Sequence, residues 1–198
     1  MNIPRYPLLF LLWLALPGCG QGTDRKLYYD TGQPLLTSTF DNTCNCHRVK
    51  EYYRSGRLLK SYAYDVGLQQ SAKHVGEDVL YSEKGHVLRF RYWKDGAPEG
   101  RAYGNREDGS LSFEQYYHDK FKAGMWKYYR PDGTRLLEIL FEENKTPWNS
   151  DADDAVYAYF VNDTLTYSEA RLGGKPVQTT VHDPAKYPLL QIPETLDR

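Results

Sequence analysis

The chain has 198 residues, of which 25 are Lys or Arg and 26 are Asp or Glu, so its formal net charge is −1. This balance argues against a nucleic-acid role, because such a role needs a positively charged face that displaces counterions. The 18 tyrosines, 4 tryptophans and 7 phenylalanines outnumber the 2 methionines. Tyrosine suits the surface of a sheet, where its ring packs and its hydroxyl meets water.

The first segment, residues 1–18, has the parts of a secretory signal peptide. Arg5 precedes an unbroken apolar run from Leu8 to Leu16, and small residues follow it. A helix of this length spans only about 14 Å, which is too short to cross a membrane. A basic start, a short apolar core and a small-residue end together predict a cleaved signal.

The end of this segment, Leu16-Pro-Gly-Cys19, resembles the lipobox of bacterial lipoproteins. The resemblance implies cleavage before Cys19 and lipid on its thiol and amine, so residues 19–26 form a tether. The alternative is an ordinary signal peptide with an incidental cysteine. Gly20 and Gln21 follow, with no Asp beside the cysteine. By resemblance to the sorting rule of enteric bacteria, this implies the periplasmic face of the outer membrane, with the inner membrane as the alternative.

Paired glycines recur with a fixed spacing in the middle of the chain. The two members of each pair enclose eight residues, and each pair follows the previous one by 24 residues. These pairs are Gly76 and Gly85, Gly100 and Gly109, and Gly124 and Gly133. A fixed period of this length is typical of a repeat array.

Apolar and polar residues alternate between the glycines, as they do in strands. Within 87–93, Leu88, Phe90 and Tyr92 share one face, and we expect that face to be the buried one. The same alternation recurs at 111–117 and 137–141. Turn signals such as the one ending at Gly133 supply the positive φ that tight hairpins require. The sequence therefore predicts an all-β fold of antiparallel hairpins laid side by side, with about two strands in each 24 residues.

The best-formed unit, Gly124-Met-Trp-Lys-Tyr-Tyr-Arg-Pro-Asp-Gly133, resembles the MORN repeat. The string Tyr52-Tyr-Arg-Ser-Gly-Arg-Leu58 is similar to its bacterial variant, and the resemblance covers residues 27–145. It implies an elongated, twisted antiparallel sheet without enzymatic machinery. The bacterial variants occur in secreted or lipid-anchored proteins that are often labelled antitoxin-like.

The last segment, residues 146–198, departs from the repeat. A polar stretch at 145–154 reads as a turn-rich break, within which 151–154 is expected to be a solvated turn. Strands are predicted at 155–161, 164–170 and 177–181. Repeat arrays need their terminal edges covered. We therefore expect a C-terminal β-hairpin cap that continues the sheet, followed by an extended tail from Asp183.

Cys44-Asn-Cys46 is the one local cluster of cysteines. Two cysteines at i and i+2 on a strand point the same way, and an oxidising envelope compartment favours a disulfide between them. Free buried thiols are the alternative. A metal would need two more ligands, which no nearby spacing provides. The sequence therefore predicts no metal site and no cofactor.

The sequence contains no phosphate-cradling loop and no G-x-S-x-G motif, and its histidines are scattered. We therefore expect a protein-binding module rather than an enzyme. The resemblance and the expected location point to an immunity protein that occludes a toxic effector, for example an envelope-targeting hydrolase. The alternative is a structural or accessory envelope lipoprotein without a toxin partner.

Trp93 is the sequence's candidate for a partner contact. It lies on the strand face opposite Leu88, together with Arg89 and Arg91, and flat apolar area next to guanidinium donors is common at interface hot spots. A solvated face with this tryptophan covered by the C-terminal cap is the alternative. Trp126, at the signature aromatic position of the repeat, is expected in the core.

Overall fold

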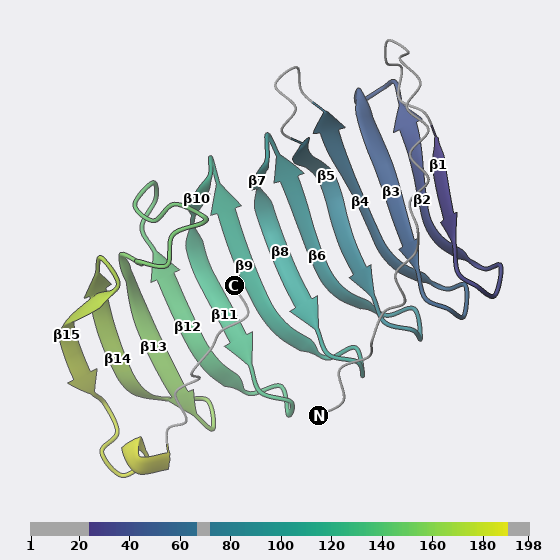
Figure 1. The fold of residues 1–198 in the computed structure, drawn as a ribbon. Helices are drawn as coiled ribbons and strands as arrows, with labels where there is room; N and C mark the ends of the chain where they lie inside the picture. The colour runs from purple at the N-terminus through teal and green to yellow at the C-terminus, as the bar shows by residue number, and fades with distance from the viewer. Residues whose placement is uncertain (1–23, 67–71, 190–198) are drawn as a thin grey trace.

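The computed structural model describes residues 24–66 and 72–189, which form one open antiparallel sheet (Figure 1). A short 3-10 turn, η1 (Tyr187–Leu189), follows the last strand. The strands are β1 (Arg25–Tyr28), β2 (Pro34–Asp41), β3 (Cys46–Tyr52), β4 (Leu58–Val66), β5 (Ala72–Tyr81), β6 (Val87–Lys94), β7 (Ala97–Pro98), β8 (Gly100–Asn105), β9 (Leu111–His118), β10 (Phe121–Lys122), β11 (Gly124–Tyr129), β12 (Arg135–Phe141), β13 (Ala155–Val161), β14 (Thr164–Leu172) and β15 (Lys175–Val181).

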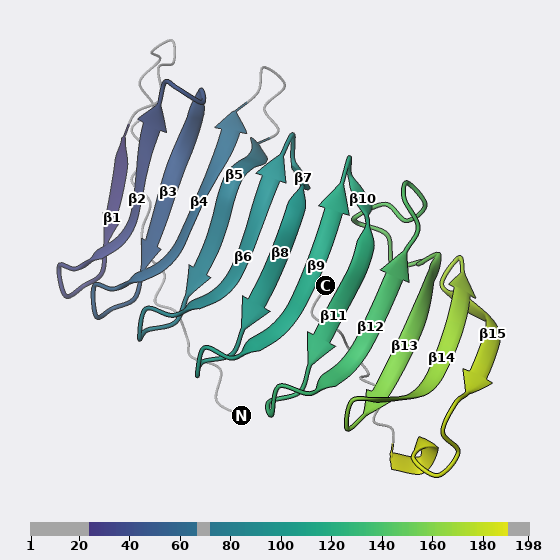
Figure 2. The same cartoon turned by 180° about the vertical axis from the view of Figure 1, so that it is seen from behind.

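Strands that follow one another in the chain are neighbours in the sheet. The order runs from β1 to β15, and the two-residue strands β7 and β10 pair with β6 and β9 beside this path. The view from behind shows the same single layer of strands (Figure 2). The predicted all-β class, an elongated sheet of antiparallel hairpins, is confirmed.

Tight turns line one rim of the sheet, the lower one in Figure 1. Most of these turns contain a glycine with a positive φ, such as 83° at Gly133, as the sequence predicted. A residue without Cβ takes this φ without strain. Gly133 donates its N–H to the Arg130 carbonyl at 2.9 Å, and Asp132 Oδ1 accepts the N–H of Thr134 at 2.9 Å. These two bonds close the turn.

The first residue of most of these turns also ties its hairpin to the next one. Its side chain donates a hydrogen bond to a backbone carbonyl at the end of the following hairpin's first strand. The pairs are Tyr29 to Tyr52, Tyr53 to Tyr81, Arg106 to Tyr129 and Arg130 to Phe160. Neighbouring hairpins are therefore linked along this rim by side chains as well as by strand pairing.

The two faces of the sheet differ in burial, and we name each by one residue. On the Trp126 face, Phe113, Tyr128, Leu137 and Tyr159 lie opposite one another across β9, β11, β12 and β13. This face carries the hydrophobic core, and Trp126 is 2% exposed, as expected. The core consists of Ala102, Phe113, Tyr117, Trp126, Tyr128, Leu137, Ile139, Phe141, Ala155, Tyr157 and Tyr159. The opposite, Tyr116 face is more open.

The expectation that Leu88, Phe90 and Tyr92 face the core was wrong. Register places Arg89 opposite Gly104 and Gly104 opposite Phe113, so β6 turns its Arg and Trp93 side to the core face. The prediction failed because it assumed that the face with the charged residues is the solvent-facing one. The Arg91 guanidinium lies over the rings of Trp93 and Tyr117, at 5.6 and 5.7 Å from their centroids, so this arginine packs on the aromatic side.

The C-terminal strands β13, β14 and β15 continue the sheet from β12, as expected, and β15 is the last strand of the described sheet. The tail after β15 is not simply extended. It turns at η1, and the Tyr187 ring lies 5.6 Å from that of Tyr167. The predicted signal peptide and Cys19 lie outside the described residues, and β1 takes in the last residues of the predicted tether.

Candidate protein-binding surface

Side chains that are exposed, apart from the half-buried Met125, form a row across neighbouring strands of the Tyr116 face. We call Tyr92, Arg101, Tyr116, Met125, Leu140 and Val156, which lie on β6, β8, β9, β11, β12 and β13, the exposed row. Arg101 lies opposite Tyr116, and Leu140 lies opposite both Met125 and Val156. Strands are about 4.8 Å apart, so the row is about 24 Å long.

The large apolar members of the exposed row are open to solvent. Tyr92, Leu140 and Val156 are each 45–46% exposed and Tyr116 is 39% exposed. Single exposed apolar residues are ordinary, whereas a contiguous row of them marks an interaction site in many soluble proteins. Tyrosine, methionine and arginine, which make up four members of the row, are also among the types enriched at interfaces.

A second row on the same face fixes the orientation of Arg101. The Arg101 Nε donates to Glu114 Oε1 at 3.0 Å, and the guanidinium lies 4.8 Å from the centre of the Tyr103 ring. The bond to Glu114 raises the pKa of Arg101 above its usual range. The row therefore contains one permanently charged, oriented donor among apolar side chains.

A hollow of about 720 Å³ adjoins the Tyr92 end of the row. Ser61 and Ala63 on β4 contribute short side chains to its lining, and Lys50 on β3 and Tyr92 on β6 contribute long ones. The surface is therefore lowered over β4. A protruding side chain of a partner could enter here while the rest of the partner contacts the exposed row.

Sequence reasoning missed the exposed row, although the repeat contained the signal. Tyr92, Tyr116 and Leu140 are 24 residues apart, and so are Arg101 and Met125. Apart from Val156, which lies outside the repeat, the row is therefore built from two equivalent positions of the repeat. Aligning the units on their glycines would have shown large apolar residues recurring at one position, but only the strand register shows that this position is exposed.

The predicted partner-binding residues lie on the other face. The Trp93 ring is 5.6 Å from that of Trp148 and 5.0 Å from that of His74. Trp148 belongs to the segment between β12 and β13, so Trp93 and Arg91 are partly covered while Arg89 stays exposed. The structure thus brings the three residues onto one face, with a neighbouring tryptophan over one of them.

A buried ion pair holds that covering segment to the sheet. Lys122 Nζ lies 2.6 Å from Asp153 Oδ1 and donates to the Ser150 carbonyl at 2.8 Å, and the Tyr157 hydroxyl donates to Asp153 Oδ2 at 2.5 Å. Lys122 and Asp153 are 3% and 4% exposed. The expectation of a solvated turn at 151–154 was therefore wrong for Asp153, because Lys122 from β10 neutralises it in the interior.

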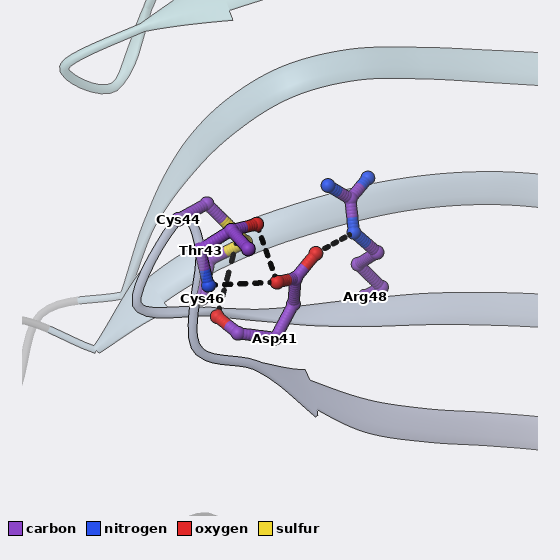
Figure 3. Close-up of a disulfide and its surroundings, with 5 residues drawn as sticks. All are labelled: Asp41, Thr43, Cys44, Cys46 and Arg48. Carbon is purple, nitrogen blue, oxygen red and sulfur yellow. Dashed lines mark hydrogen bonds and ion pairs between the residues drawn. A yellow bond between two sulfur atoms is a disulfide. The ribbon is translucent and has the colours of Figure 1, made fainter.

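The structure joins Cys44 and Cys46 by a disulfide across the turn between β2 and β3 (Figure 3). Asp41 Oδ1 accepts bonds from the Thr43 hydroxyl and N–H, and Asp41 Oδ2 lies 2.6 Å from Arg48 Nε. The bonds from the Thr43 hydroxyl and from Arg48 lower the pKa of Asp41 to about 2. The network fixes the shape of this turn on the rim opposite the glycine turns.

Glu99, His118 and Asp119 bring together side chains that could ligate a metal. Both carboxylate oxygens of Glu99 are already in contact, Oε1 with His118 Nδ1 at 3.1 Å and Oε2 with the Asp119 N–H at 3.0 Å. The bond to Glu99 raises the pKa of the exposed His118. The contacts that Glu99 makes with His118 and Asp119 account for the cluster. They link the turns of two successive units.

Comparison with known proteins gave no assignment: neither the family models nor the curated proteins contain a match to this chain. In residues 24–66 and 72–189, no helix is both long and apolar enough to cross a membrane.

Proposed function

We propose that this chain is a protein-binding module tethered by lipid on Cys19 to the periplasmic face of the outer membrane, where it acts as an immunity protein against a toxic effector. The observation that carries the binding role is the exposed row. The immunity role and the location rest on the resemblance to bacterial MORN-type proteins and to the lipobox.

Two structural features support binding through the Tyr116 face. The core lies on the opposite face, so the exposed apolar side chains of Tyr92, Tyr116 and Leu140 add little to folding. The strand pairing beneath them is continuous, so the row is presented on a rigid element. A rigid, pre-ordered surface reduces the entropy cost of association.

The test uses the full chain with Cys19→Ser as bait in solubilised envelope from the producing cells. Tyr116→Ser combined with Leu140→Ser removes the centre of the exposed row. Leu27→Ser combined with Tyr28→Ser is the matched control, because these residues are 54% and 58% exposed at the far end of the sheet. A specific partner should bind the parent and the control but not the row variant.

A growth assay then tests immunity. The captured protein, directed to the periplasm of cells that lack this chain, should stop growth. The parent chain should restore growth, and the row variant should not. Equal capture by all three baits would contradict the binding surface. A captured protein without toxicity would favour the accessory lipoprotein.

A further inference from the structure

The two edge strands of the sheet differ in how well they are protected. β1 has four residues, two of which are Arg25 and Lys26. β15 has seven residues, all of them exposed, and Lys175 and Pro176 lie at its start. Sheets discourage edge pairing by short edge strands and by charged residues or proline on the edge. By this criterion β1 is protected along its length, whereas β15 is protected only at its start and is open from Val177 to Val181.

The backbone of β15 presents unpaired groups outward. The N–H of His182 donates to the Thr166 carbonyl of β14 at 2.8 Å. The backbone N–H and C=O groups of successive strand residues point to alternate edges of the strand. Those of Thr180 therefore also face β14, and those of Thr179 and Val181 face away from it. In the described part of the chain, β15 pairs with β14 alone.

We propose that β15 pairs with β15 of a second copy of this chain, antiparallel, with Thr179 opposite Thr179. This register places Val177 opposite Val181 and Lys175 opposite Asp183 of the other copy. Both β-branched pairs and opposite charges are favoured across strands. Centring the pair one residue earlier would place Lys175 opposite Val181, so the pair of opposite charges would be lost, although Val177 would still meet a β-branched residue, Thr179.

The arrangement is a closed, self-complementary dimer, since the same strand serves both copies about a two-fold axis. An antiparallel pair within one sheet has this axis perpendicular to the sheet, so the Tyr116 faces of the two copies lie on the same side. The dimer therefore presents two exposed rows to one side. Its formation depends on the edge strand and not on the proposed binding function.

The test is sedimentation equilibrium of the full chain with Cys19→Ser over a range of micromolar to submillimolar concentrations. The apparent mass should rise from one chain toward two. Thr179→Pro removes an N–H that faces away from β14, so the fold should persist while dimerisation weakens by at least about tenfold. Leu140→Ser, on the exposed row, is the control and should dimerise like the parent.

Cysteine cross-linking tests the register. Thr179→Cys should give a covalent dimer under mild oxidation, whereas Val181→Cys should not, because its neighbour is Val177. A chain that is monomeric at every concentration overturns the proposal, as does a dimer unaffected by Thr179→Pro. Dimerisation that appears only after deletion of residues 190–198 also overturns it, since the edge would then belong to that segment.

Discussion

At the residue scale, Gly104 shows how a glycine outside the repeat pattern can be required by packing. Gly104 on β8 lies opposite Phe113 on β9, and a Cβ added to it would lie 2.3 Å from Phe113 Cε1. The buried ring therefore lies over the glycine backbone. The positive φ of Gly133 followed from its place in a turn motif, whereas nothing in the sequence marks Gly104, because the next unit has Tyr128 at the equivalent position.

Gly104→Ala should lower the free energy of unfolding by about 1–3 kcal/mol, because the Phe113 ring must move in a packed core. Urea unfolding measures this loss. In a Phe113→Ala background the same substitution should cost little, since the atoms that clash are gone. An equal cost in both backgrounds would show that the ring is not the cause.

At the element scale, the segment between β12 and β13 covers the Trp126 face and is held there by a buried ion pair as well as by backbone hydrogen bonds. The strand at 155–161 was predicted correctly, because local alternation defines it. The pairing of Lys122 with Asp153 joins residues 31 positions apart. No local pattern shows which of the three carboxylates at 151–154 meets the lysine, so this contact could not be predicted from the sequence.

Asp153→Asn should destabilise the chain by about 3–5 kcal/mol, because it leaves the Lys122 ammonium buried without its counter-charge. Thermal and urea unfolding measure the change. Lys122→Met combined with Asp153→Asn should cost less than the sum of the two single changes, since neither charge is then left alone. Additive losses would mean that the two side chains are independent.

At the scale of the whole molecule, the order of the strands could be predicted and the buried face of each strand could not. The 24-residue period places successive hairpins side by side, which determines the order. Burial depends on which face the segment with Trp148 covers, and that segment lies outside the repeat. Tyr92 was placed in the core and Trp93 on the surface for this reason.

We expect acid to destabilise the fold by protonating aspartates in its turns. Bonds from hydroxyl, backbone or arginine donors lower the pKa of Asp41, Asp108, Asp132 and Asp163, from 3.8 to about 2 in the case of Asp41. A carboxylate with a lowered folded-state pKa contributes stability that is present above its unfolded value and is lost as the pH falls through the folded value.

The melting temperature should therefore fall between about pH 4 and about pH 2. A variant with all four of these residues changed to Asn should start from a lower melting temperature and lose less over the same interval, as measured by circular dichroism. Parallel curves for the two proteins would show that these turns do not control acid unfolding.

The ties that most turns on this rim make to the next hairpin have a consequence for how such a chain can change in length. Each tie reaches only the adjacent hairpin, as at Arg106 and Tyr129, so inserting a complete 24-residue unit replaces one tie by two equivalent ones, and removing a unit does the reverse. Two strands add about 9–10 Å to the sheet. The length of the array is therefore set by its number of units, and the distance between its two ends can change in equal steps without redesign of the turns.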